Sequence, residues 1–519
     1  MKTGDYRRDH AAYTAAFERA RYDYHTGVAP RLRLAPLRDR YADLWTRDAI
    51  DDLARAREET PTQFETERTA LAALLRAAQL GFLEARATEV TNELARCTSS
   101  ARIMWDGAAL SPEDAPDALA AEPDAARRRE LSARWFDALH ECSDLRAARF
   151  DTLNEAARTL DGNSYFGLLS EISGASLENL SAGADNFLAR TASRYNAHLF
   201  EWSARHLPAD FARPPAYADS LFFMRLAHLD DYFPASDLRA TYDATMRGLG
   251  IHVEAQRNLR LETVTNGVGS VCAAACFAVN PPEDVRLVYR SGSGVSCYRN
   301  FFEAAGRAQH FAWVSRDLAA RYPELAYAPE EATRAGFSFL FGDLHRDTAW
   351  LAAHRRVRPS EANEIAREFA LVELHRTRRA CVRLREQRAL EQAVDARSEQ
   401  LAESYATAFE EATGFRAHPS LYLRDLVPDN LHDARATSEE RLPPAAYLRA
   451  RLFSTALGEY LRTRHGHRWW QSRGAADELI DMWNTGSRYT VEELASLVGL
   501  GAPDFDLLAD TAETALIRE

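Results

Sequence analysis

Two charged residues within an otherwise apolar stretch are the first feature that could carry chemistry. The segment NFFEAAGRAQHFAW (300–313) has apolar residues at three- and four-residue spacing, which predicts a core helix. Glu303 and Arg307 are four residues apart, so both side chains lie on one face of that helix and can form an ion pair. Such a pair would compensate a carboxylate that is otherwise buried alone.

The same spacing matches the H-E-x-x-H helix of zinc peptidases, in which two histidines hold the metal and the glutamate acts as general base. In this frame Glu303 stands at the first histidine, Ala304 at the base and Arg307 at the second histidine. A carboxylate can bind zinc, but a guanidinium offers no lone pair, and alanine cannot accept a proton from water. Gly306 keeps the small residue often found before the second histidine. The frame therefore predicts no catalytic residue and an incomplete metal site.

The sequence around this helix resembles a known family. The block CFAVNPPEDVRLVYRSGSGVSCYRNFFEAAGRAQHFA (276–312) and the helices after residue 440 are similar to the thimet oligopeptidase and oligoendopeptidase F family of helical zinc metallopeptidases, the gluzincins. In that family a strand, a glycine-containing turn and the zinc helix follow one another at this spacing. The resemblance implies a mainly α, two-lobed metallopeptidase-like fold with a deep channel and one small antiparallel β-sheet.

The family's third zinc ligand is a glutamate on the next helix, and in the best register that position falls at or near Ala335. Glu330 and Glu331 lie one turn earlier. Three interpretations stay open: a core helix that matches the motif by chance, a peptidase fold whose metal site is lost, and an altered metal site. The altered site would combine Glu303 with Glu330, Glu331 or His310. A lone histidine such as His310 is more often a hydrogen-bonded core residue than a ligand.

The strand before the helix is the predicted ligand-binding element. The segment VRLVYR (285–290) alternates as a half-exposed strand does. In the resembled fold it would line the channel and could add a peptide as an extra strand, which needs no metal. The family also uses a tyrosine and histidines late in the chain. The candidate ligand-binding residues are therefore Val285, Leu287, Tyr289 and Tyr447, with His418 and His432 as weaker candidates.

Three functions follow from these observations. The first is a cytoplasmic pseudo-metallopeptidase that binds a peptide or peptide-like molecule in the channel and holds no cofactor. The second is an active zinc-dependent oligopeptidase that uses shifted metal ligands. The third is a structural helical partner protein. Tightly bound zinc and peptide cleavage that a chelator abolishes would identify the second function.

Composition narrows the class of protein. The chain has 519 residues, of which 46% are hydrophobic and 27% charged, as in ordinary globular proteins. A net charge of −13 argues against a nucleic-acid-binding protein. No apolar run approaches the roughly 20 residues that cross a membrane, and no secretory signal is visible. The six cysteines are scattered, which predicts reduced thiols in a cytoplasmic protein.

Glycine, proline and the spacing of apolar residues predict the organisation of the chain. We expect a helical N-terminal lobe over 1–245 and a metallopeptidase-like lobe over 246–519, which carries the β-sheet and the degenerate zinc helix. A short antiparallel strand pair is expected within 266–294. The stretch 360–413 has neither glycine nor proline and predicts one very long helix or two closely joined ones. Its arginines at 376, 379 and 383 predict a solvated face or a set of ion pairs.

Overall fold

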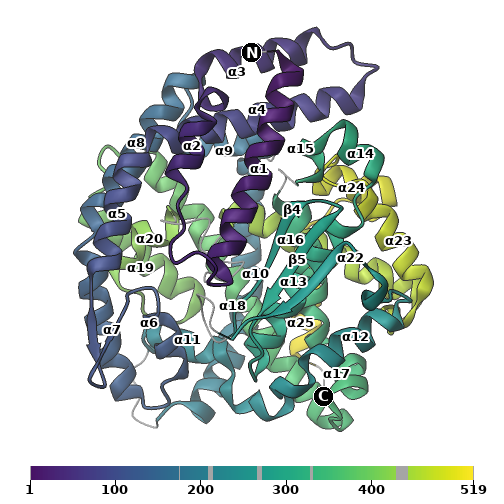
Figure 1. Cartoon of the computed structure of the whole chain (residues 1–519). Coiled ribbons are helices and arrows are strands. Elements are labelled where there is room, and N and C mark those ends of the chain that lie inside the picture. Colours follow the sequence, from purple (N-terminus) through teal and green to yellow (C-terminus); the bar gives the residue numbers. More distant parts are fainter. Residues whose placement is uncertain are drawn as a thin grey trace. The chain divides into compact units, whose positions relative to one another are not determined.

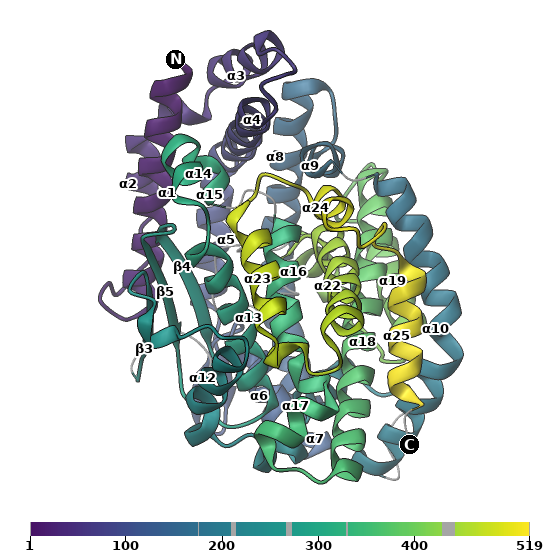
Figure 2. The same cartoon turned by 90° about the vertical axis from the view of Figure 1, so that its right-hand side faces the viewer.

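The computed structural model describes residues 2–174, 176–208, 214–265, 272–327, 331–427 and 442–517. The fold is mainly α, as predicted, with two small sheets in the described ranges (Figure 1 and Figure 2). The chain divides into two compact units. Unit 1 consists of Met1–Ala85, Asp231–Arg358 and Arg449–Pro503, and unit 2 of Arg86–Asp230, Pro359–Leu448 and Asp504–Glu519. Each unit takes segments from both sides of residue 245, and the predicted lobe boundary and channel stay predictions.

Unit 1 contains a three-stranded sheet and the helices around it. Its strands are β3 (Leu259–Thr263), β4 (Ala274–Asn280) and β5 (Asp284–Tyr289). Its helices are α1 (Thr3–His25), α2 (Ala35–Arg40), η1 (Ala42–Trp45), α3 (Arg47–Glu59), α4 (Glu65–Arg86), η3 (Ala235–Asp237), α12 (Leu238–Gly248), η4 (Val253–Ala255), α13 (Val295–Ala312), α14 (Arg316–Arg321), α15 (Pro323–Ala326), α16 (Glu331–Gly342), η5 (Asp343–Arg346), α17 (Thr348–Arg355), η7 (Trp469–Gln471), α23 (Arg473–Asn484) and α24 (Val491–Val498). Helix α22 (Pro444–His465) begins in unit 2 and continues in unit 1.

The sheet of unit 1 has the order β3-β5-β4. Strand β4 runs antiparallel to β5, which confirms the predicted strand pair, whereas β3, which was not predicted, runs parallel to β5 on its other side. Leu287 is opposite Leu261 on β3 and Cys276 on β4. Because both edges of β5 are paired, this strand cannot add a peptide as a further strand. That prediction is wrong.

Helices cover the two faces of the sheet. Successive side chains of a strand point to opposite sides, so Arg286 and Tyr289 lie on different faces. On one face Arg286 stacks over the ring of Tyr22 from α1, with its Cζ 4.3 Å from the ring centroid. On the other face Tyr289 meets Phe301 of α13 edge-on, with ring centroids 4.7 Å apart. The strands and these two helices lie side by side in Figure 2. The predicted zinc helix therefore packs directly on the strand pair that precedes it.

Two glycines allow α13 to approach α16 closely. A Cβ atom at Gly306 would lie 2.7 Å from the carbonyl oxygen of Phe337 on α16, which is too close for any side chain. A Cβ atom at Gly342 would lie 2.5 Å from Cγ of Glu303. Gly306, which the sequence analysis singled out as the small residue before the second ligand position, therefore serves the packing of these two helices.

Unit 2 is built around the long helix α18. Its elements are α5 (Thr88–Ser100), β1 (Ile103–Trp105), β2 (Ala108–Leu110), α6 (Ala115–Ala121), α7 (Ala125–His140), α8 (Ser143–Asp161), α9 (Tyr165–Ser173), α10 (Leu177–His206), α11 (Tyr217–Arg225), η2 (Ala227–Tyr232), α18 (Pro359–Glu391), α19 (Glu399–Thr413), η6 (Pro419–Leu421), α20 (Tyr422–Leu426) and α25 (Phe505–Leu516). The stretch predicted as one or two helices is thus two, α18 and α19, and Gly414 ends the second in a left-handed conformation with φ of 70°.

The arginines of α18 are buried, so the predicted solvated face is wrong. Helices α10, α19, α20 and α25 pack against α18. Arg378 donates from Nη1 to the Leu188 carbonyl oxygen at 2.8 Å, and Arg383 donates from Nε to the Asp425 carbonyl oxygen at 2.8 Å. Arg376 pairs with Glu373, as the alternative of ion pairs predicted. Carbonyl groups of neighbouring helices can satisfy buried guanidinium donors, which is why the stripe is tolerated inside.

The cysteines also differ from the prediction. Cys97 is bonded to Cys142 within unit 2, and Cys272 to Cys297 within unit 1, while Cys276 and Cys381 are free and buried. The prediction of reduced thiols is therefore wrong for four of the six. The cytoplasmic location loses the support of the cysteines and stays a prediction. None of the helices in the described ranges is both long enough and apolar enough to cross a membrane.

The close contact of α13 with α16 can be tested by Gly306→Ala. We expect this substitution to lower the free energy of unfolding by about 1–3 kcal/mol, because the added methyl group meets a backbone oxygen that moves only with α16. Gly458→Ala is the matched control, since Gly458 lies inside α22 and its nearest neighbouring atom would be 3.6 Å from a Cβ. The control should be neutral or stabilising by up to about 1 kcal/mol. Equal destabilisation of both variants in urea unfolding would contradict the close contact.

Candidate functional site on helix α13

Contacts with α12 fix the rotation of α13. The ring of Tyr242 on α12 meets Phe301 and Phe302 edge-on, with centroids 5.2 and 5.9 Å away. Two turns further on, Gln309 donates from Nε2 to the Tyr242 hydroxyl at 3.0 Å and accepts at Oε1 from the Trp313 indole N–H at 3.0 Å. Apolar and polar contacts thus hold α13 in a single orientation, and this sets the direction of residues 303, 304 and 307.

Glu303 forms a buried ion pair with a residue that the sequence analysis missed. Arg299 Nη2 lies 3.0 Å from Glu303 Oε1, and the two side chains are 5% and 6% exposed. The segment RNFFE has the same four-residue spacing as Glu303 and Arg307, so the signal for this pair was present in the sequence. The expected contact of Glu303 with Arg307 stays a prediction.

The positions of the base and of the second histidine carry no metal-binding or proton-accepting group. Ala304 is buried and Arg307 is half-buried. Burial raises the pKa of the Cys276 thiol on β4 to about 12, and the nearby positive charge of Arg307 only partly opposes this. Arg307 therefore lies near β4, beside a thiol that stays protonated at neutral pH and is not a nucleophile.

The second helix also lacks the third ligand at its best-matched position. Ala335 on α16 is fully buried. Glu331 is 45% exposed at its side chain and pairs with Arg334 at 3.3 Å on the surface of the helix. Glu330 lies outside the described residues. Among the described residues, the frame that resembles the zinc site therefore supplies one carboxylate, that of Glu303, and this carboxylate is held by Arg299. This set of donors does not fit a zinc ion.

His310 behaves as a core histidine. It is completely buried, donates from Nε2 to the Gly486 carbonyl oxygen at 3.1 Å, and lies 5.1 Å from the Phe337 ring centre to centre. Burial lowers its pKa to about 4, so the ring is neutral at physiological pH. The Nε2 atom of His310 therefore already forms a hydrogen bond with a backbone carbonyl group.

The predicted ligand-binding side chains are core residues. Val285 and Leu287 are fully buried, and Tyr289 is 5% exposed beneath Phe301. Tyr447, in unit 2, is also fully buried. In this structure these side chains pack inside the protein and have almost no contact with solvent. The weaker candidates lie elsewhere: His418 stacks on Phe136 in unit 2 with ring centroids 4.3 Å apart, and His432 is outside the described residues.

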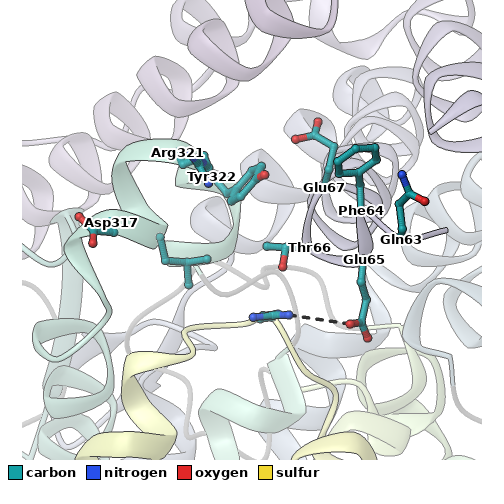
Figure 3. A pocket seen from close by; sticks show the side chains of 10 residues that line it. Gln63, Phe64, Glu65, Thr66, Glu67, Asp317, Arg321 and Tyr322 are labelled. Atoms are coloured by element: carbon teal, nitrogen blue, oxygen red, sulfur yellow. Dashed lines mark ion pairs between the residues drawn. The ribbon is translucent and has the colours of Figure 1, made fainter. Parts of the chain in front are cut away.

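Unit 1 also has an open hollow that contains none of the predicted site residues. It has a volume of about 450 Å³ and is lined by residues from the start of α4, from α14 and by Arg488. Figure 3 shows the side chains of the first two groups from close by. Arg488 lies 3.9 Å from Glu65 across this hollow. The lining combines Phe64 and Leu318 with acidic and basic side chains and has neither histidine nor cysteine. Such a lining offers charged side chains to a polar group.

Within the described ranges, one group of His, Cys, Asp and Glu side chains could hold a metal ion. It consists of His206, His228 and Glu368, whose ligand atoms all lie within 4.8 Å of one another. All three belong to unit 2, so neither Glu303, His310 nor Glu331 takes part in it. The sequence analysis did not find this group, because its members are far apart in the chain and follow no motif.

Comparison with solved structures shows which proteins share this fold. An M32 carboxypeptidase from Deinococcus radiodurans R1 is 13% identical, with a TM-score of 0.56 and coverage of 99% of this chain and 98% of that one. Trypanosoma cruzi metallocarboxypeptidase 1 is 14% identical, with a TM-score of 0.58 and coverage of 99% of both chains. Pz peptidase A, solved with an inhibitor, is 13% identical, with a TM-score of 0.61 and coverage of 91% and 85%.

These likenesses show a metallopeptidase-like helical fold. At such low identity they show the fold alone. No protein-family pattern matches the chain. No curated protein matches it either. The resemblance to oligoendopeptidase F is therefore supported only at the coarser level of this fold.

The buried Arg299–Glu303 pair predicts a large difference between two glutamate substitutions. Glu303→Ala removes the carboxylate from beside a buried guanidinium and should lower the free energy of unfolding by about 3–5 kcal/mol. Glu331→Ala removes the carboxylate of an exposed pair, so its effect should stay within about 1 kcal/mol. Urea unfolding of both variants measures the difference. If Glu303→Ala were as stable as Glu331→Ala, the pair would contribute nothing to the core.

His310 predicts a pH dependence of stability. Its folded pKa of about 4 lies below the unfolded value of about 6.5. Between pH 4 and pH 6.5 this imidazole is therefore protonated in the unfolded chain and neutral in the folded one. The stability that neutral His310 contributes is complete above about pH 6.5 and is lost as the pH falls toward 4, by up to about 3 kcal/mol. His310→Gln should flatten the unfolding free energy over this range, and exposed His252→Gln should not. An unchanged pH profile for His310→Gln would contradict this account.

Proposed function

We propose that this chain is a pseudo-metallopeptidase: a protein of metallopeptidase-like fold that has lost the zinc mechanism and binds a peptide or peptide-like ligand without hydrolysing it. The observation that carries the proposal is the set of side chains at the zinc-helix positions. A buried carboxylate paired with Arg299, an alanine and a guanidinium occupy the positions of the first ligand, the base and the second ligand.

The chemistry of these side chains supports the loss of hydrolysis. Zinc peptidases need three protein ligands and a group that takes a proton from the metal-bound water. Glu303 offers one ligand and already accepts from Arg299, Ala304 has no basic atom, and Arg307 is permanently protonated. Ala335 contributes no donor at the best-matched third position. Water activation at α13 therefore lacks both its metal and its base.

The ligand class follows from Arg307 and from the names of the similar structures. Arg307 is half-buried, and a guanidinium can bind a carboxylate through two parallel hydrogen bonds. Two of the similar structures are carboxypeptidases by name. We therefore expect Arg307 to bind the free C-terminal carboxylate of a peptide. Backbone pairing would then use β3 or β4, since β5 is paired on both sides.

Metal content and peptide cleavage test the loss of catalysis. We expect no cleavage of a quenched peptide mixture and no effect of a chelator on this assay. The variant Glu303→His/Ala304→Glu/Arg307→His should also stay inactive, because Ala335 leaves the third ligand missing. Peptide cleavage by the natural chain that a chelator abolishes and zinc restores would overturn the proposal in favour of an active zinc oligopeptidase with shifted ligands.

Binding of matched peptides tests the role of Arg307. Fluorescence anisotropy with a labelled peptide mixture, once with free C-terminal carboxylates and once amidated, should show tighter binding of the free form. Arg307→Gln should weaken binding of the free form by about 10-fold or more, the loss expected for a charged hydrogen bond, and leave the amidated form unchanged. Arg316→Gln is the control, since Arg316 is 75% exposed and pairs with Glu283. Equal affinity for the two forms would exclude Arg307 as the carboxylate site.

A further inference from the structure

We propose that His206, His228 and Glu368 bind a divalent transition-metal ion of the zinc class, at a site in unit 2 that is separate from α13. The ligand atoms of these three side chains all lie within 4.8 Å of one another. Two imidazoles and one carboxylate are a donor set that zinc accepts in proteins, with a fourth position left for water or another ligand. The proposal does not depend on the function proposed for α13.

Three separate segments bring the ligands together. His206 is the last residue of α10, His228 lies in the short helix η2, and Glu368 is in the third turn of α18. Helices α10 and α18 pack against each other, and Figure 2 shows them side by side. A metal ion at this point would fasten the end of α10 and the segment η2 to the central helix of unit 2.

The distances suit ligation after small side-chain movements. His228 Nε2 is 2.7 Å from Glu368 Oε2, and the rings of His206 and His228 are 4.4 Å apart, inclined by 32°. Bonds of about 2.0–2.1 Å in a tetrahedral site place ligand atoms roughly 3.3–3.5 Å apart. Since the observed separations run from 2.7 Å to no more than 4.8 Å, they bracket this value. Rotations of the imidazole and carboxylate groups about their terminal bonds can adjust such differences.

The surroundings hold the ligands and leave a route for the ion. The buried ring of Trp202 stacks on His206 with centroids 4.9 Å apart, which restricts that imidazole. The side chains of His228 and Glu368 are 33% and 17% exposed, so an ion can enter from solvent. Imidazole nitrogen favours Zn²⁺, Ni²⁺ or Cu²⁺ over Mg²⁺ and Ca²⁺, which prefer sites made of oxygen atoms. Arg205, the residue before His206, pairs with Glu201 at 3.9 Å.

The test uses the full chain, stripped of metal with a chelator, and Zn²⁺ as the probe. Competition with a chromophoric chelator should give one tight Zn²⁺ equivalent per chain, and Co²⁺ should give the intense visible bands of a four-coordinate site. His206→Ala, His228→Ala and Glu368→Gln should each weaken Zn²⁺ binding by about 100-fold or more. A lost ligand should cost more than the 10- to 100-fold typical of outer partners. Zn²⁺ should raise the unfolding temperature of the natural chain and not that of these variants.

Two further variants keep the result interpretable. His198→Ala is the matched control, because His198 lies on α10 near Glu201 and outside the group, and it should bind Zn²⁺ as the natural chain does. Glu303→Ala tests whether the carboxylate on α13 takes part in Zn²⁺ binding, and it should bind Zn²⁺ as the natural chain does. Circular dichroism and the unfolding temperature without metal verify that each variant is folded. The proposal is overturned if the natural chain binds no Zn²⁺ equivalent, if the three ligand variants retain it, or if Glu303→Ala removes it while His228→Ala does not.

Discussion

The close packing of α13 against α16 is the constraint on which the candidate site depends. Gly306 allows α13 to approach the backbone of α16, and Gly342 leaves room for the side chain of Glu303. Glu303 lies in that space and pairs with Arg299 inside the core. The positions that would hold a metal in the resembled family are therefore part of a tightly packed helix contact. A ligand can be recognised here only by groups that remain partly exposed, of which Arg307 is one.

Local signals in the sequence predicted the elements nearest the site. Alternation over 285–290 and the apolar spacing over 300–313 predicted β5 and α13 as elements. The half-exposed strand was wrong, because helices cover both faces of the sheet and Val285–Tyr289 is buried throughout. Helix caps are equally local. Ser176 accepts from the Asn179 N–H, and Thr490 and Glu493 form a capping box. Each of these features depends on residues within a few positions of one another.

Features that depend on distant segments were missed. Strand β3 pairs in parallel with β5 across more than 20 residues of chain, and no alternation in β5 alone reveals that partner. In the sequence the arginines of α18 have the spacing of an exposed stripe. In the structure carbonyl oxygens of α10 and α20 accept hydrogen bonds from them, and these helices are distant in the chain. The group His206, His228 and Glu368 exists only because two helices and a short turn meet. Arg299 is the exception, since its four-residue spacing from Glu303 is visible in the sequence, as is that of Arg307 on the other side.

Charge explains how a buried carboxylate can be kept at the first-ligand position of the resembled zinc helix. A zinc ion brings two positive charges into the core, and Arg299 and Arg307 bring the same number one turn to either side of Glu303. The carboxylate therefore stays compensated, but a guanidinium does not release its proton, so it cannot itself become a metal ligand. At Glu368 the hydrogen-bond partner is an imidazole, His228. A metal there displaces at most a proton from nitrogen. The two carboxylates thus differ in one respect that decides their chemistry: the partner of Glu368 can become a ligand, and the partner of Glu303 cannot.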